Sequence, residues 1–146
     1  MKISSVLTVK RKDRRMTRSK LREQMFRLCF SIDFHATEEF EAQADLYLEE
    51  NDFFRNKEKE YIKKRTLDML SRLGEIDQKI NENSKGWDIK RLGKAELTIL
   101  RIAVYEIMFD EDIPNKVAIN EAVELSKTYC NEKAASFVNG ILGKIG

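Results

Sequence analysis

Basic side chains near the start of the chain are the groups whose number and spacing most directly suggest a chemical role. Residues 1–27 hold ten Lys or Arg residues against Asp13 and Glu23, a local charge of +8. The whole chain carries +2, so the other 119 residues carry −6, the difference between these two values. A basic segment joined to an acidic body is typical of an arm that binds nucleic acid. A solubilising tail that binds nothing is the alternative, and composition alone does not separate the two.

Residues able to support metal binding or catalysis are few. Cys29 and Cys130 have no C-x-x-C spacing and His35 is the only histidine, so no zinc site is predicted. We expect both cysteines to be free thiols, buried or half-buried, in a reducing compartment. The sequence has no nucleophile elbow, Walker loop or dinucleotide fingerprint, and its carboxylates lie at helix-surface spacings. It therefore predicts a protein that is not an enzyme and has no metal or cofactor.

Membrane insertion and secretion are not predicted. No apolar run in the sequence approaches the roughly 20 residues that a membrane-spanning helix needs. Residues 1–15 contain a short apolar patch, but the charge after it and the lack of a small-residue cleavage site argue against a secretory signal. We therefore expect a cytoplasmic protein.

The element most able to organise the fold is a helix predicted over residues 94–109. Eleven of its sixteen residues are apolar and lie on nearly every side at 3.6 residues per turn, the pattern of a helix enclosed by others. A narrow polar stripe remains, in which Lys94, Thr98, Arg101 and the Tyr105 hydroxyl share one face and could reach solvent or a polyanion.

Two further helices are predicted after the Ile113-Pro114 step, over residues 117–129 and 137–145. Asn139-Gly140 would normally indicate a hairpin turn, but the apolar residues around it repeat at helical spacing. A glycine inside a helix costs about 1 kcal/mol relative to alanine. We therefore expect another backbone to lie close to Gly140.

The first half of the chain is predicted to form four helices. Thr17 and Thr37 are candidate N-caps, Gly74 is a candidate C-terminal stop, and Trp87 is expected to seal the junction between two halves. The predicted ranges are 17–34, 38–49, 57–73 and 76–85. The fold class is therefore all-α, about seven helices in two packed helical subdomains, about 16–74 and 75–146, after a basic and disordered extension over 1–15.

A sixteen-residue block near the end of the chain carries a resemblance to a known family. The string DIPNKVAINEAVELSK, residues 112–127, and the string FVNGILGKI from residue 137 resemble the C-terminal signature of the NusB family. A block of this length is far less likely to arise by chance than a short glycine motif. Upstream, the segment SKLREQMFRLCF is similar to the family's basic first helix, and further matches to a W…RL…E…ILRxAxYE pattern are Trp87, Arg91, Leu92, Glu96, residues 99–103, Tyr105 and Glu106.

The sequence departs from the family pattern at two places. The resemblance covers roughly residues 16–146, and sequences of this family commonly begin at the position of Met16. Residues 1–15 are therefore interpreted as an extension, or as the result of a start codon assigned too early. Relatives usually have a glycine and an acidic residue where this chain has the run from Cys130 to Lys133. We expect Asn131 to take the left-handed conformation that ends a helix.

The resemblance implies a function and partners. Proteins of this family are transcription antitermination factors with the same all-α fold in two subdomains. They form a heterodimer with a small ribosomal protein, NusE, and the pair binds the single-stranded boxA element of nascent RNA. This helps RNA polymerase in the elongation complex to read through terminators, notably in bacterial ribosomal RNA operons. A homodimer in the absence of the partner is left open.

Most of the expected RNA contacts are basic residues that match basic positions in the family, and Lys133 and Phe137 are added because they flank the last loop. Arg101 is equally well explained as a structural ion pair. For the partner we expect Phe30 and Glu106 to be contact positions, with core packing and a surface ion pair as their alternatives. The expected RNA-binding residues are Arg14, Arg15, Arg18, Lys20, Arg22, Arg101, Lys116, Lys133 and Phe137.

Two other functions stay open on the sequence alone. One is a non-catalytic RNA-recruiting module in ribosomal RNA biogenesis, similar to the NusB-related domain attached to some RNA cytosine methyltransferases. The other is a protein-interaction module without an RNA role, for which the basic arm would be incidental. Salt-sensitive RNA binding by the purified chain would separate this last function from the others.

Overall fold

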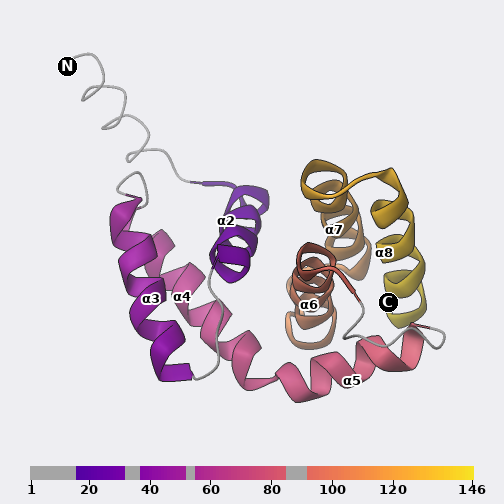
Figure 1. Cartoon of the computed structure of the whole chain (residues 1–146), viewed down its shortest axis with the longest axis horizontal. Helices are drawn as coiled ribbons and strands as arrows, with labels where there is room; N and C mark the ends of the chain where they lie inside the picture. Colours follow the sequence, from indigo (N-terminus) through magenta and orange to yellow (C-terminus); the bar gives the residue numbers. More distant parts are fainter. Residues whose placement is uncertain (1–15, 32–36, 52–54, 85–91) are drawn as a thin grey trace, which may run out of the picture. The chain divides into compact units, whose positions relative to one another are not determined.

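The computed structural model describes residues 16–31, 37–51, 55–84 and 92–146 (Figure 1). These residues form seven helices and no strand, which confirms the predicted all-α class. The helices are α2 (Arg18–Ser31), α3 (Thr37–Glu50), α4 (Asn56–Ser71), α5 (Leu73–Asn83), α6 (Lys94–Phe109), α7 (Asn115–Tyr129) and α8 (Glu132–Ile145). Trp87, His35 and the extension over 1–15 lie outside the described residues.

The chain divides into two compact units, Met1–Asp68 and Met69–Gly146, whereas the sequence placed the division near residue 75. Gly74 does not end a helix as predicted, because it lies inside α5. The helical break between α4 and α5 falls at Arg72. The backbone N–H of Arg72 donates to the Met69 carbonyl at 3.0 Å. The Arg72 guanidinium lies 4.2 Å from the centroid of the Phe109 ring, a cation–π contact that helps to hold this turn.

The first unit contains α2, α3 and most of α4. Thr17 caps α2 as predicted, since its Oγ1 accepts from the Lys20 backbone N–H at 3.2 Å. The buried side of α3 is formed by Phe40, Ala44 and Leu48, which are at most 3% exposed. The side chain of Thr37 and the predicted extension of α2 beyond residue 31 lie outside the described residues.

Ionic contacts between helices link the elements of the first unit. Lys63 of α4 places its Nζ 2.9 Å from Asp45 and 3.2 Å from Glu41, both on α3. Burial raises the pKa of Tyr47 on α3, and the charge of Arg27 on α2 partly lowers it. Exposed pairs of this kind add little stability, and the apolar side chains of the three helices supply most of it.

The second unit is arranged around α6, whose bounds are those predicted. Leu100 and Val104 are completely buried, and Ile99 and Ile102 are 1% exposed, so the helix is enclosed on several sides. Helices α5, α7 and α8 all pack against α6, and α7 and α8 lie side by side in Figure 1.

The polar stripe of α6 does not face solvent along its length as the sequence indicated. Thr98 is 8% exposed, and its hydroxyl donates to the Lys94 carbonyl at 2.7 Å. A threonine can bond the carbonyl four residues earlier in this way, which satisfies the hydroxyl without solvent. Tyr105 is 5% exposed, which leaves Lys94 as the exposed member of the stripe and Arg101 as a partly exposed one.

The structure differs from two predictions for the last two helices, one at Asn131 and one at Gly140. The Asn131 backbone is extended, with φ −160° and ψ 180°, and its Oδ1 accepts from the Ala134 N–H at 2.8 Å. The residue therefore begins α8 as an N-cap instead of ending α7 in a left-handed conformation. Gly140 lies within α8, and, apart from its own helix, no atom of the described residues lies within 4 Å of the position of a Cβ. No other backbone in the described part of the chain therefore approaches Gly140 closely.

The remaining expectations concern thiols, metals and membranes. Cys29 is buried and Cys130 is half-buried, and neither forms a disulfide bond. No group of three or more His, Cys, Asp or Glu side chains could hold a metal ion among the residues that the structure describes. None of the described helices is long and apolar enough to cross a membrane.

Candidate nucleic-acid interface

The start of α2 presents cations in the first unit. Arg18 and Lys20 are exposed. The Nζ of Lys20 lies 3.4 Å from the Glu23 carboxylate, an exposed pair at i,i+3. Because such a pair contributes little energy, Lys20 can exchange it for a phosphate. Arg14 and Arg15 lie outside the described residues.

Arg22 differs from the other expected RNA contacts on α2. Only 7% of it is exposed, and it lies four and seven residues before the buried Phe26 and Cys29, on the same face. Met25, Leu28 and Cys29 of α2 are at most 4% exposed. The buried surface of α2 is wide enough to include Arg22 as well, which the sequence had placed on an exposed side.

Arg101 forms a structural ion pair in the second unit. Its Nε and Nη2 each donate at 2.8 Å to one oxygen of Asp77 on α5. The two side chains are 21% and 27% exposed. A bidentate pair of this kind holds both planes in one orientation, so Arg101 joins α5 to α6. The structure therefore supports the ion-pair alternative for this residue.

Lys116 and Lys133 lie at opposite ends of the second unit. Lys116 is exposed in the first turn of α7. At that end a Cβ on Gly146, the last residue, would lie 3.3 Å from Asn115. Lys133 is exposed in the first turn of α8, beside the start of α6. Because α7 has fifteen residues, its length separates the two lysines by roughly 20 Å. A single bound nucleotide cannot contact both.

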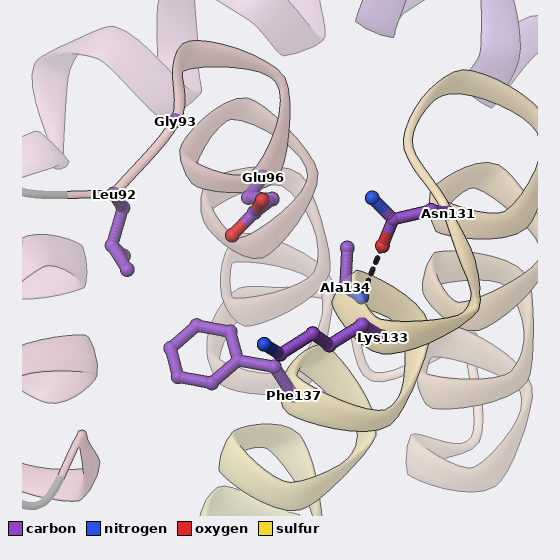
Figure 2. A pocket seen from close by; sticks show the side chains of 7 residues that line it. All are labelled: Leu92, Gly93, Glu96, Asn131, Lys133, Ala134 and Phe137. Atoms are coloured by element: carbon purple, nitrogen blue, oxygen red, sulfur yellow. Dashed lines mark hydrogen bonds between the residues drawn. The ribbon is translucent and has the colours of Figure 1, made fainter.

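Lys133 and Phe137 do come together, at a pocket of about 290 Å³ between the starts of α6 and α8 (Figure 2). Figure 2 shows the Lys133 side chain extending toward the Phe137 ring, with the Glu96 carboxylate on the opposite wall. The Asn131 side chain lies at the upper edge, where its Oδ1 accepts from Ala134. The other lining residues are Leu92, Gly93 and Ala134.

The pocket combines groups that suit a nucleotide. The Phe137 ring is half-buried and offers an aromatic surface on which a base can stack. The Lys133 ammonium can meet a phosphate, and the Glu96 carboxylate can accept from an exocyclic amine. Sequence reasoning identified Lys133 and Phe137 but missed Glu96 and Asn131. Glu96 was noted only as part of a family pattern, and Asn131 only as a helix end.

The charge of Glu96 also affects Cys130, which does not line the pocket. Burial raises the pKa of the Cys130 thiol, and the nearby Glu96 carboxylate raises it further. Cys130 therefore keeps its proton more strongly than an ordinary thiol, which argues against a reactive thiolate. The pKa of the Cys130 thiol therefore reports the presence of the Glu96 charge, and we assign the thiol no function of its own.

The two expected partner contacts differ in exposure. Phe30, at the end of α2, is 41% exposed and stacks on Phe26 with ring centroids 5.7 Å apart. It therefore offers an apolar surface to a partner. Glu106 on α6 is 3% exposed, so the surface ion pair considered for it is not what the structure shows. Its role in partner binding stays a prediction.

Comparisons with known proteins agree with this fold. The family model described as the NusB family matches residues 19–146. A protein named transcription antitermination protein NusB from Agathobacter rectalis is 43% identical over 129 residues, 88% of this chain and 98% of that protein. A protein of the same name from Lachnoclostridium phytofermentans is 44% identical over 130 residues, 89% of this chain and 98% of that protein.

Two solved structures are also similar. NusB of T. maritima superposes with a TM-score of 0.79 and 33% identity, and the match covers 90% of this chain and 92% of that one. A chain in the crystal structure of a plectonemic RNA supercoil superposes with a TM-score of 0.73 and 31% identity, covering 88% and 94%.

Proposed function

The chain belongs to the NusB family, and on this premise we propose that it is a transcription antitermination factor that binds boxA RNA together with the small ribosomal protein NusE. Bound to nascent RNA in the bacterial cytoplasm, the pair promotes read-through by the RNA polymerase elongation complex, notably in ribosomal RNA operons. The family match over residues 19–146 is the single observation that carries this proposal.

The geometry of the second unit supports single-stranded RNA as the ligand. A base must be unpaired to stack on Phe137 within the pocket, because the edges and faces of bases in a duplex are covered by their neighbours. Lys133 lies beside the ring, where it can meet the phosphate of the stacked nucleotide. These contacts bind and orient RNA, and the protein performs no chemical step.

The first unit contributes charge and a partner surface. Arg18 and Lys20 are exposed at the start of α2, and phosphate contacts from such cations release counterions and make binding salt-dependent. Phe30 lies at the other end of the same helix and is 41% exposed. We assign it to the contact with NusE, since a partly exposed ring that stacks on a core ring can bury its outer face against a partner.

Fluorescence anisotropy with a boxA RNA and a scrambled control, at two salt concentrations and with and without NusE, tests the proposal. We expect NusE to tighten binding and to increase the preference for boxA. Equal weak binding to both RNAs, unchanged by NusE, would contradict it and leave a helical interaction module as the function.

A further inference from the structure

One buried carboxylate in the first unit holds two segments of the backbone together. Glu58 lies in the first turn of α4 and is 6% exposed. Its Oε1 accepts from the Arg55 N–H at 2.9 Å, and its Oε2 accepts from the Met16 N–H at 2.7 Å. The first bond closes the start of α4, and the second reaches a residue 42 positions earlier in the chain.

The two bonds place the start of α2 against the start of α4. Both nitrogens are bound to oxygens of the same carboxylate, so the backbone at Met16 and at Arg55 can lie only a few ångströms apart. Hydrogen bonds to an ionised acceptor are short and about twice as strong as neutral ones. Burial removes competing water, so the contact resists opening.

This contact brings together basic side chains from distant parts of the sequence. Arg18 and Lys20 follow Met16, while Arg55 and Lys57 begin the α4 segment, and all four are exposed. Arg18, Arg55 and Lys57 form no ion pair with any described residue. Glu58 is the acid nearest to them in α4, and its two oxygens are already used by the backbone. The sequence predicts a helix that begins near Lys57 but does not indicate that its first residues belong to a basic surface.

We propose that Arg18, Lys20, Arg55 and Lys57 form one phosphate-binding surface, the composite basic surface, and that Glu58 is the positioning residue that assembles it. This inference rests on the proposed function, because its ligand is the same single-stranded RNA. It adds the start of α4 to the RNA contacts and gives the buried acid a role. Glu58 also fixes the backbone at Met16.

The contribution of α4 is tested with the double variant Arg55→Glu, Lys57→Glu. Acidic residues suit the first turn of a helix, so the variant is expected to fold. We expect about a tenfold loss of affinity for boxA RNA at low salt, and a fall of about 1.4 in the slope of log K against log salt, about 0.7 for each contact. Lys64→Glu with Lys79→Glu changes the net charge equally, outside the composite basic surface, and should lower the slope much less.

The role of Glu58 is tested with Glu58→Gln, for which charge and positioning predict opposite results. The substitution adds one positive charge, so charge alone predicts tighter RNA binding. It also replaces one carboxylate oxygen with an NH2 group that cannot accept, so positioning predicts weaker binding. We expect weaker binding, together with amide hydrogen exchange at Met16 faster by about tenfold or more.

Each outcome decides between the two proposals. An unchanged slope in the Arg55, Lys57 variant, or tighter binding by Glu58→Gln, overturns the composite basic surface. If Arg18→Glu with Lys20→Glu still weakens binding in that case, the proposed function stands and only the extension to α4 fails. If the unmodified chain binds neither RNA, with or without NusE, both proposals fail.

Discussion

The two units offer RNA different kinds of contact. The composite basic surface of the first unit consists of long exposed cations, and none of its four side chains is aromatic. The pocket of the second unit has a single cation beside a ring, with a carboxylate and an amide on its walls. The composite basic surface is therefore suited to bind the RNA backbone through charge, whereas the pocket is suited to bind a single nucleotide.

From these different contacts we predict which property of RNA binding each unit controls. Contacts between cations and phosphates are independent of sequence and weaken with salt. A ring and hydrogen-bonding groups in a pocket contribute affinity that depends less on salt and can distinguish base edges. The first unit should therefore control the salt dependence of RNA binding. The second unit should control the salt-independent part of the affinity and the base preference.

Among the substitutions that test this division of roles, we expect Phe137→Ala to have the largest effect on RNA affinity. Loss of a stacked base costs about 1–3 kcal/mol, roughly a five- to 150-fold rise in Kd for boxA RNA, with the salt slope unchanged. Tyr129→Ala removes an exposed ring of α7 that does not line the pocket, and should leave Kd unchanged. A fall in salt slope with Phe137→Ala would show that the pocket acts mainly through charge.

Arg18→Glu with Lys20→Glu tests the other side of the comparison. We expect about a tenfold loss of affinity at low salt and a slope lower by about 1.4, equal for boxA and scrambled RNA because phosphates carry no sequence. Anisotropy titrations at several salt concentrations measure both quantities. A loss confined to boxA would mean that these residues read bases, and the division of roles between the units would be wrong.

Arg101→Ala separates a structural cation of the second unit from its RNA-binding ones. The bidentate bonds to Asp77 are partly buried, so we expect the free energy of unfolding to fall by roughly 1 kcal/mol, between the values for exposed and buried charged bonds. Urea denaturation measures this change. Lys127→Ala, which breaks an exposed pair with Glu124, is the matched control and should cost less. Unchanged stability with a lower salt slope would return Arg101 to the RNA contacts.

The smallest effect is expected from removing the negative charge of Glu96 in the pocket. The composite basic surface has no such charge. Burial first, and Glu96 second, raise the pKa of Cys130, so less thiolate is present at pH 8 and alkylation is slow. In a Cys29→Ala background, Glu96→Gln should lower this pKa and accelerate alkylation of Cys130. Iodoacetamide labelling followed by mass spectrometry measures the rate across pH, with the unfolded chain as reference. An unchanged rate would place the Glu96 charge away from the thiol.

The elements that could be predicted are those whose pattern is strong over several turns. Helix α6 has the predicted bounds because apolar residues surround it, and α7 begins two residues before the predicted range. The start of α8 could not be predicted, because an asparagine suits both a left-handed helix end and an N-cap. The backbone conformation of Asn131 decides between them, and it places that residue at the edge of the pocket.

The amino-acid sequence was sufficient to predict the all-α class, the concentration of positive charge near the start, and membership of the NusB family. These follow from composition, helical periodicity and an extended motif, all of which are local in the chain. Only the tertiary structure decided which charged side chains are available to a ligand. Arg22 is buried, Arg101 is held by Asp77, and Glu58 joins two basic segments. The physical reason is that these contacts link residues 24 or 42 positions apart, whereas helical periodicity relates only residues within a few turns.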